Sequence, residues 1–89
     1  MNSITNMNTK IYILFETDQW LTKSNSTILA VCTSKEKAVD LFEEIAKNRT
    51  DIGIDDIIYA IDQMIESMQS TLLLDGYYIE EYQINELMF

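Results

Sequence analysis

Carboxylates are the only side chains of this sequence that are numerous enough to suggest chemistry. Asp51, Asp55 and Asp56 cluster around a glycine, but the order D-I-G-I-D-D lacks the ligand spacing and final glutamate of a calcium loop. Because aspartate is common at helix starts, helix capping is the better interpretation. Glu80 and Glu81 are adjacent on an expected strand and face opposite sides, which excludes a simple acid–base pair.

Other reagents for catalysis are missing from the sequence. There is no histidine, so the usual general base, serine triad and imidazole metal ligand are absent. With only two glycines, the chain has no glycine-rich loop to hold a phosphate. Cys32 lies in an expected strand without a cationic neighbour, as is typical of a buried structural thiol. We therefore predict a protein that is not an enzyme, with no catalytic residues, no cofactor and no bound metal.

The charge of the chain points to a class of partner. Fifteen acidic and six basic residues give a formal net charge of -9, and the acidic residues are spread along the sequence. Direct binding of nucleic acid is disfavoured because it requires clustered lysine and arginine. The same negative field attracts a basic protein and accelerates the encounter at low salt, although high charge also serves solubility.

Length and composition predict one small domain. Residues 1–9 are polar and without periodicity, so we expect a flexible N-terminal tail followed by a single domain over 10–89. A single cysteine, no signal-peptide pattern and no apolar run of ~20 residues favour a cytoplasmic protein that does not contact a membrane. The small core and the apolar end Leu87–Phe89 make a homodimer an alternative.

The first half of the chain reads as two strands and a helix. Residues 10–20 carry apolar side chains on both faces, which predicts an interior strand, and residues 27–33 form a second β-rich run that would complete a hairpin. Thr33 and Glu36 have the spacing of a capping box, so a helix should begin there and end near Asn48. Its apolar face contains Ala38, Leu41, Phe42, Ile45 and Ala46.

The second helix is predicted over residues 54–68. One apolar face follows the helical period: Ile54, Ile57, Ile58, Ile61, Met64, Ile65 and Met68. The outer face carries a line of four residues at spacings of four, three and four: Asp55, Tyr59, Asp62 and Glu66. Asp55 and Asp56 also suit the positive end of the helix dipole. We expect this line to face the solvent and to take part in partner binding.

The chain closes on a tyrosine-rich strand over residues 77–84. Residues 72–76 either end the second helix or form a hairpin at Asp75-Gly76. Alternation places Tyr78, Glu80 and Tyr82 on one side of the strand and Glu81 on the other. Tyrosines suit the edge of a core or the centre of a binding patch, so these four residues join the predicted contact surface.

Together these elements predict an α+β fold with the order β-β-α-α-β. Three or four mainly antiparallel strands would carry two helices on one face, with a ferredoxin-like split arrangement as the alternative. The segments "IYILFET", "CTSKEKAVDLF" and "YYIEEYQI" resemble those of small uncharacterised proteins from phages and bacterial mobile elements. The resemblance implies an acidic DNA mimic that inhibits a nucleic-acid-binding host enzyme, as anti-CRISPR and anti-restriction proteins do. The expected partner is therefore a basic protein.

Overall fold

The fold is a four-stranded antiparallel sheet with two consecutive helices. A computed structural model describes residues 8–85. The elements are β1 (Asn8–Asp18), the 3-10 turn η2 (Lys23–Asn25), β2 (Thr27–Cys32), α1 (Lys35–Lys47), α2 (Ile54–Ser67), β3 (Gln69–Leu72) and β4 (Asp75–Asn85). The strands lie in the order β2-β1-β4-β3, and every neighbouring pair is antiparallel. The predicted α+β class is confirmed, and the helices do not alternate with the strands as a ferredoxin-like arrangement requires.

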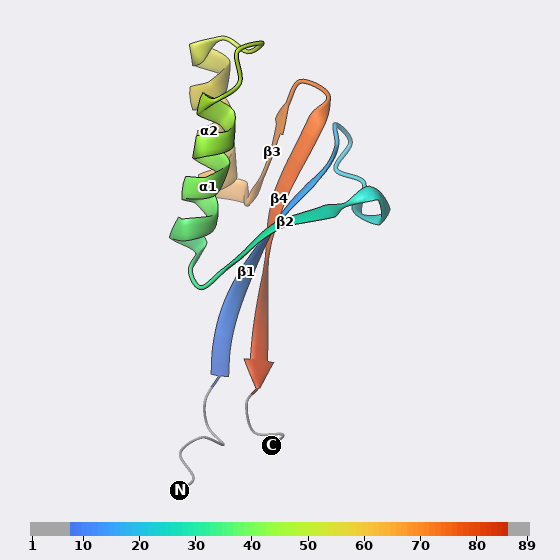
Figure 1. Cartoon of the computed structure of the whole chain (residues 1–89), viewed down its shortest axis with the longest axis vertical. Coiled ribbons are helices and arrows are strands. Elements are labelled where there is room, and N and C mark those ends of the chain that lie inside the picture. The colour runs from blue at the N-terminus through green and yellow to red at the C-terminus, as the bar shows by residue number, and fades with distance from the viewer. Residues whose placement is uncertain (1–7, 86–89) are drawn as a thin grey trace, which may run out of the picture.

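Both helices cover the same face of the sheet (Figure 1). Directly paired residues of neighbouring strands share a face. Leu14 of β1 is opposite Ala30 of β2 and Ile79 of β4, and all three pack in or against the core cluster beneath the helices. The prediction of an interior first strand is confirmed, because β1 lies between β2 and β4.

The core forms where α1 crosses the sheet. Phe42 of α1 and Leu14 of β1 are fully buried, as is Met64 of α2. The Phe42 ring meets the Tyr77 ring of β4 edge to face, with 5.2 Å between centroids, which is a favourable geometry for two aromatic quadrupoles. Of the predicted α1 face, Leu41 remains 38% exposed, and Val39 is buried in its place.

Helix α1 begins one residue later than the sequence predicts. Ser34 is the N-cap, and its hydroxyl accepts a hydrogen bond from the Lys37 backbone N–H at 3.2 Å. The capping box of Thr33 and Glu36 is therefore wrong, because Ser34 is the residue with the extended backbone of a cap, at φ -147° and ψ 156°. Asn48 caps the other end, as predicted.

The segment after α2 forms a hairpin. Met68 ends the helix in the left-handed region, at φ 59°, and β3 starts at the next residue. The two residues between Leu72 and Asp75 make the turn, with Leu73 at φ 57°. The hairpin alternative is therefore correct, but the turn lies at Leu73 and Leu74 and not at the predicted Asp75-Gly76 pair.

Gly76 has a steric role instead. It lies within β4 opposite Thr17, and a Cβ there would be 2.1 Å from the carbonyl oxygen of Asp18. The end of β1 and the loop that follows it thus pack directly on the Gly76 backbone.

Strands β1 and β4 are longer than their neighbours. They pair from Asn8 opposite Asn85 to Asp18 opposite Asp75, whereas β2 reaches only Tyr12 along β1. The sheet therefore narrows to a two-stranded ribbon at one end (Figure 1). Asn8 and Thr9 belong to β1, so the predicted tail was drawn two residues too long; its first seven residues lie outside the described part of the chain, as does the predicted apolar end Leu87–Phe89.

Candidate protein-binding surface

The exposed side of helix α2 combines apolar and acidic side chains. We call it the α2 outer face and define it by seven residues: Ile54, Asp55, Ile58, Tyr59, Asp62, Ile65 and Glu66. At 100° per residue they share one arc of the helix, isoleucines along one side and the acidic line along the other. Tyr59 is 66% exposed, and Ile54, Ile58 and Ile65 are 65%, 53% and 47% exposed.

The isoleucines of this face are a finding that the sequence did not predict. All were expected in the core, but only Ile57, Ala60 and Met64 of α2 are buried, with Ile61 and Met68 packed partly against them. The apolar arc of the helix is wider than the surface that the sheet and α1 cover. The signal in the sequence is the number of apolar residues, which exceeds what one packed face of a helix this long uses.

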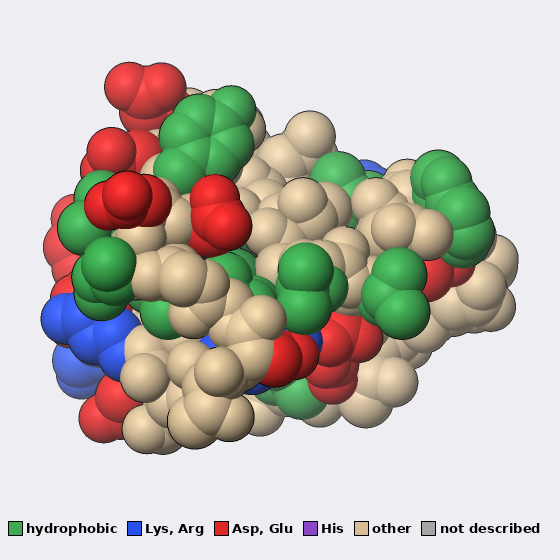
Figure 2. All heavy atoms as spheres, turned by 90° about the horizontal axis from the view of Figure 1, so that it is seen from above, with side chains coloured by type: hydrophobic (Ala, Val, Ile, Leu, Met, Phe, Trp, Pro, Cys, Tyr) green, Lys and Arg blue, Asp and Glu red, His purple; other side chains and the backbone are tan. Residues whose placement is uncertain are grey.

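The carboxylates of the α2 outer face are exposed. Asp55, Asp62 and Glu66 form none of the ion pairs found within residues 8–85. Lys35 approaches α2, but its Nζ donates to the Ile65 carbonyl oxygen at 3.0 Å. Seen from above, the helical side of the molecule shows carboxylates and apolar side chains, with a group of basic side chains next to them (Figure 2). The predicted solvent-facing line is therefore present, with an apolar stripe beside it.

Tyr78 of the predicted surface belongs to the fold. Its ring stacks on Phe15, with 4.7 Å between centroids, and its hydroxyl hydrogen-bonds with that of Ser26 in the β1–β2 loop. Lys23 Nζ lies 5.3 Å from the centroid of the same ring. With 6% of its surface exposed, Tyr78 presents almost no area to a partner.

Glu80 and Tyr82 are engaged within the chain. Lys23 Nζ donates to Glu80 at 2.6 Å, and the Tyr82 hydroxyl donates to the other carboxylate oxygen. The hydrogen bond from Lys23, with that from Tyr82, lowers the pKa of Glu80 below its usual value. Glu81 forms a diagonal cross-strand ion pair with Lys10 of β1 at 3.4 Å. The acidity of β4 is therefore locally neutralised.

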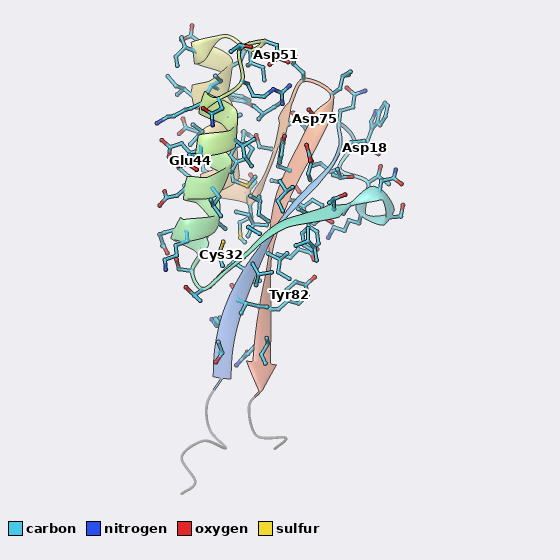
Figure 3. The ribbon with its side chains drawn as sticks, viewed as in Figure 1. Asp18, Cys32, Glu44, Asp51, Asp75 and Tyr82 are labelled. Carbon is cyan, nitrogen blue, oxygen red and sulfur yellow. The ribbon has the colours of Figure 1, made fainter. Side chains whose placement is uncertain are left out.

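Three of the four predicted β4 residues lie on the side of the molecule away from the helices. Tyr78, Glu80 and Tyr82 are opposite Phe15, Ile13 and Ile11 of β1, on the sheet face that carries no helix. Tyr82 projects from the ribbon away from the helices (Figure 3). The structure therefore brings Asp55, Tyr59, Asp62 and Glu66 together and separates them from these three residues. Glu81 is opposite Tyr12, on the face of the sheet that carries the helices.

The groups considered for catalysis do not assemble. Cys32 is 7% exposed between β2 and the helices, as expected for a structural thiol (Figure 3). Arg49 pairs with Asp51 at 2.9 Å and with Asp75 at 3.2 Å, and its hydrogen bond lowers the pKa of Asp51. Asp55 and Asp56 lie in the first turn of α2, whose N-cap is Gly53.

Across residues 8–85, no three or more histidine, cysteine, aspartate or glutamate side chains are grouped to hold a metal ion. No helix in this range is long and apolar enough to cross a membrane. Comparisons with protein-family models, curated proteins and solved structures found no match.

Proposed function

We propose that the protein is a non-enzymatic binding module that docks a basic protein on the α2 outer face. The observation that carries the proposal is the coincidence, on one exposed helix, of four large apolar or aromatic side chains with three carboxylates free of ion pairs in residues 8–85. Exposed tyrosine and isoleucine supply the desolvation that drives association, and the carboxylates select a cationic partner.

The α2 outer face differs from β4 in whether its carboxylates already form ion pairs within the described chain. Glu80 and Glu81 would have to leave Lys23 and Lys10 before meeting a partner, whereas Asp55, Asp62 and Glu66 give up no ion pair of the described chain. Arginine and lysine of a partner can therefore pair with them directly. Because the whole chain carries a net charge of -9, the same field steers a basic protein toward it before contact.

The proposed partner is a nucleic-acid-binding protein or enzyme in the cytoplasm of a host cell. This protein would inhibit it by covering its basic surface. Asp55 and Glu66 are eleven residues apart on the helix, or about 16 Å at about 1.5 Å per residue. One DNA strand places about five phosphates over that length, at about 3.4 Å each, against three carboxylates here. A pure charge mimic would be denser, so the apolar stripe contributes the remaining affinity in this proposal.

Affinity capture with charge-reversed variants tests the proposal. The tagged chain is used to capture proteins from host lysate, and the captured protein is identified by mass spectrometry and purified for titration. We expect a basic protein that binds Asp62→Lys/Glu66→Lys at least about tenfold more weakly than the wild type. Raising the salt concentration should weaken the wild-type complex, because it screens the attraction between opposite charges. Tyr59→Ala should weaken the same complex by removing the exposed aromatic ring.

The matched control is Glu36→Lys/Glu44→Lys. These exposed residues of α1 form none of the ion pairs found in residues 8–85, and their reversal changes the net charge by the same amount. The control should retain most of the affinity, because it alters the overall field while leaving all seven residues of the α2 outer face unchanged. Equal affinity for the wild type and the α2 variant would refute the proposal, and equal losses in both variants would show that only total charge matters.

A further inference from the structure

Within residues 8–85, strand β2 leaves one edge of the sheet unpaired. In this range it pairs only with β1, and its six residues, T-I-L-A-V-C, contain neither a charge nor a proline. Sheet edges are normally protected from other chains by charged residues, proline or very short strands. The opposite edge follows that rule, because β3 has only four residues and its exposed ones, Gln69 and Thr71, are polar. The β2 edge is therefore the one that can pair its free backbone groups with a further strand.

Apolar side chains are exposed on both sides of this edge. Ile28 and Val31, which are 57% and 60% exposed, are opposite Phe15 and Ile13 of β1 and therefore lie on the sheet face without helices. Leu29 is 39% exposed. A shallow groove of about 440 Å³ separates the strand from α1, where Leu41 is 38% exposed. The remaining residues of the groove are Cys32, Thr33, Lys37 and Asp40. Burying this patch would remove apolar surface from water at both the strand and the helix.

We propose that two copies of the chain associate edge to edge through β2, antiparallel, forming an eight-stranded sheet with four strands from each copy. This interface is separate from the α2 outer face. Helix α1 contacts β1, β2 and β4, whereas α2 contacts β3 and α1. Each α1 would then flank its counterpart at the centre of the dimer, and each α2 would face outward.

Charge explains why a second copy fits this edge. Two chains of net charge -9 repel each other, so they can associate only where no carboxylates are forced together. Strand β2 is uncharged, and the two charged residues of the groove, Lys37 and Asp40, have opposite signs. A two-fold axis makes contacts reciprocal, so opposite charges within one patch allow Lys37 of each chain to pair with Asp40 of the other in the proposed dimer. The charges of the edge therefore do not oppose self-association.

One irregularity limits the pairing register. Between Leu14–Ala30 and Phe15–Ile28 the β1–β2 ladder shifts, and Leu29 is the extra residue of a bulge. Bulges interrupt a ladder and bend the strand, so regular pairing between copies is restricted to the half of β2 from Ala30 to Cys32. Val31 lies in this half and is the most exposed residue of the patch. It is therefore the position at which a substitution should be most informative.

The oligomeric state of the full chain tests the proposal. Light scattering after size exclusion, over about 1 to 200 μM protein, should show the mass rise from 10.4 kDa to twice that value. Val31→Lys should remain monomeric throughout this range, because it places a charge on the edge. Leu41→Lys, on the helix side of the groove, should weaken the dimer without altering a strand. Circular dichroism of both variants verifies that the fold is retained.

Leu74→Lys is the matched control. Leu74 is 71% exposed in the β3–β4 turn, and its substitution adds the same charge away from β2, so the dimer should persist. A wild-type monomer at the highest concentration, a species larger than a dimer, or a dimer of unchanged strength in Val31→Lys would each overturn the proposal.

Two further readouts separate the dimer from partner docking. Asp62→Lys/Glu66→Lys should leave the dimer mass unchanged, since α2 lies away from the interface. Added salt should strengthen the dimer by screening repulsion between two acidic chains, whereas it should weaken the docking of a basic partner. Salt that weakens the dimer would contradict the charge argument for this interface.

Discussion

Gly76→Ala tests how closely the β1–β2 loop packs on the sheet. The new methyl group would lie 2.1 Å from the carbonyl oxygen of Asp18 and 2.9 Å from Leu21 Cδ2. The first contact is with backbone, so the end of β1 must move by about 1 Å to reach an ordinary carbon–oxygen separation. That carbonyl accepts a hydrogen bond from the Leu21 N–H at 3.0 Å, and the movement weakens it.

The expected loss of stability follows from these two effects. Overpacking costs about 1–3 kcal/mol, and a weakened hydrogen bond adds about 1 kcal/mol, so the free energy of unfolding should fall by about 2–4 kcal/mol. For a domain of this size the melting temperature should fall by roughly 10–30 °C. Urea denaturation followed by far-UV circular dichroism measures the change.

Gly53→Ala is the matched control for this substitution. A Cβ at Gly53 meets no atom within 4 Å, and the residue caps α2 at φ -70°, which alanine adopts easily. Its free energy of unfolding should change by less than about 1 kcal/mol, because alanine is a poorer N-cap than glycine but leaves the unfolded chain with less entropy. A loss below about 1 kcal/mol in Gly76→Ala, with the control unchanged, would refute the close packing of Asp18 and Leu21 on β4.

Three further substitutions test the core and the turns. Phe42→Ala removes a fully buried ring packed on Tyr77 and should lower the free energy of unfolding by about 3–5 kcal/mol in urea; a loss under about 1 kcal/mol would contradict its place in the core. Burial, together with the charge of Glu16 and the hydrogen bond to it, raises the pKa of Tyr77 from 10.0 to about 12. The neutral hydroxyl therefore contributes stability that is fully present below pH 10. This contribution is lost as the pH rises toward 12. Tyr77→Phe should therefore show a shallower alkaline fall in stability than the wild type, and equal slopes would contradict the assignment. Leu73→Gly relieves a left-handed residue at φ 57° that is 57% exposed, so thermal melting should show a gain of about 0.5–1 kcal/mol, and a loss would show that the leucine side chain matters more than the turn.

The elements that the sequence predicts well are those set by local periodicity. Helix α1 and most of α2 repeat apolar residues every three or four positions, and β1 is apolar on both faces because it lies inside the sheet. The start of α1 was off by one residue because Thr33 and Ser34 carry equivalent hydroxyls. Only the backbone conformation decides which one accepts the capping hydrogen bond.

Strand β3 could not be predicted from the sequence for a related reason. Met68 takes a left-handed conformation that glycine usually supplies, so the sequence gives no sign that the helix stops there. The four strand residues that follow are too few to establish an alternating pattern. The position of the β3–β4 turn was also unpredictable, because Leu73 has a φ of 57°, which is unusual for a leucine.

The candidate surface was predictable only in part. The line on α2 depends on spacing within one helix, and the structure shows its residues exposed together. The burial of Tyr78 depends on Ser26, which is 52 residues away in sequence, and no local pattern reveals that contact. The exposed isoleucines depend on how much of α2 the sheet covers, which is a property of the assembled layers.

The pairing of Asn8 with Asn85 places both limits of the described chain at one end of the β1–β4 ribbon, remote from the helices (Figure 1). A fused domain or surface anchor attached beyond either limit would therefore leave α2 and the β2 edge accessible. Joining the two strands there with a short linker, and opening the chain between Leu73 and Leu74, should give a circular permutant with the same sheet order.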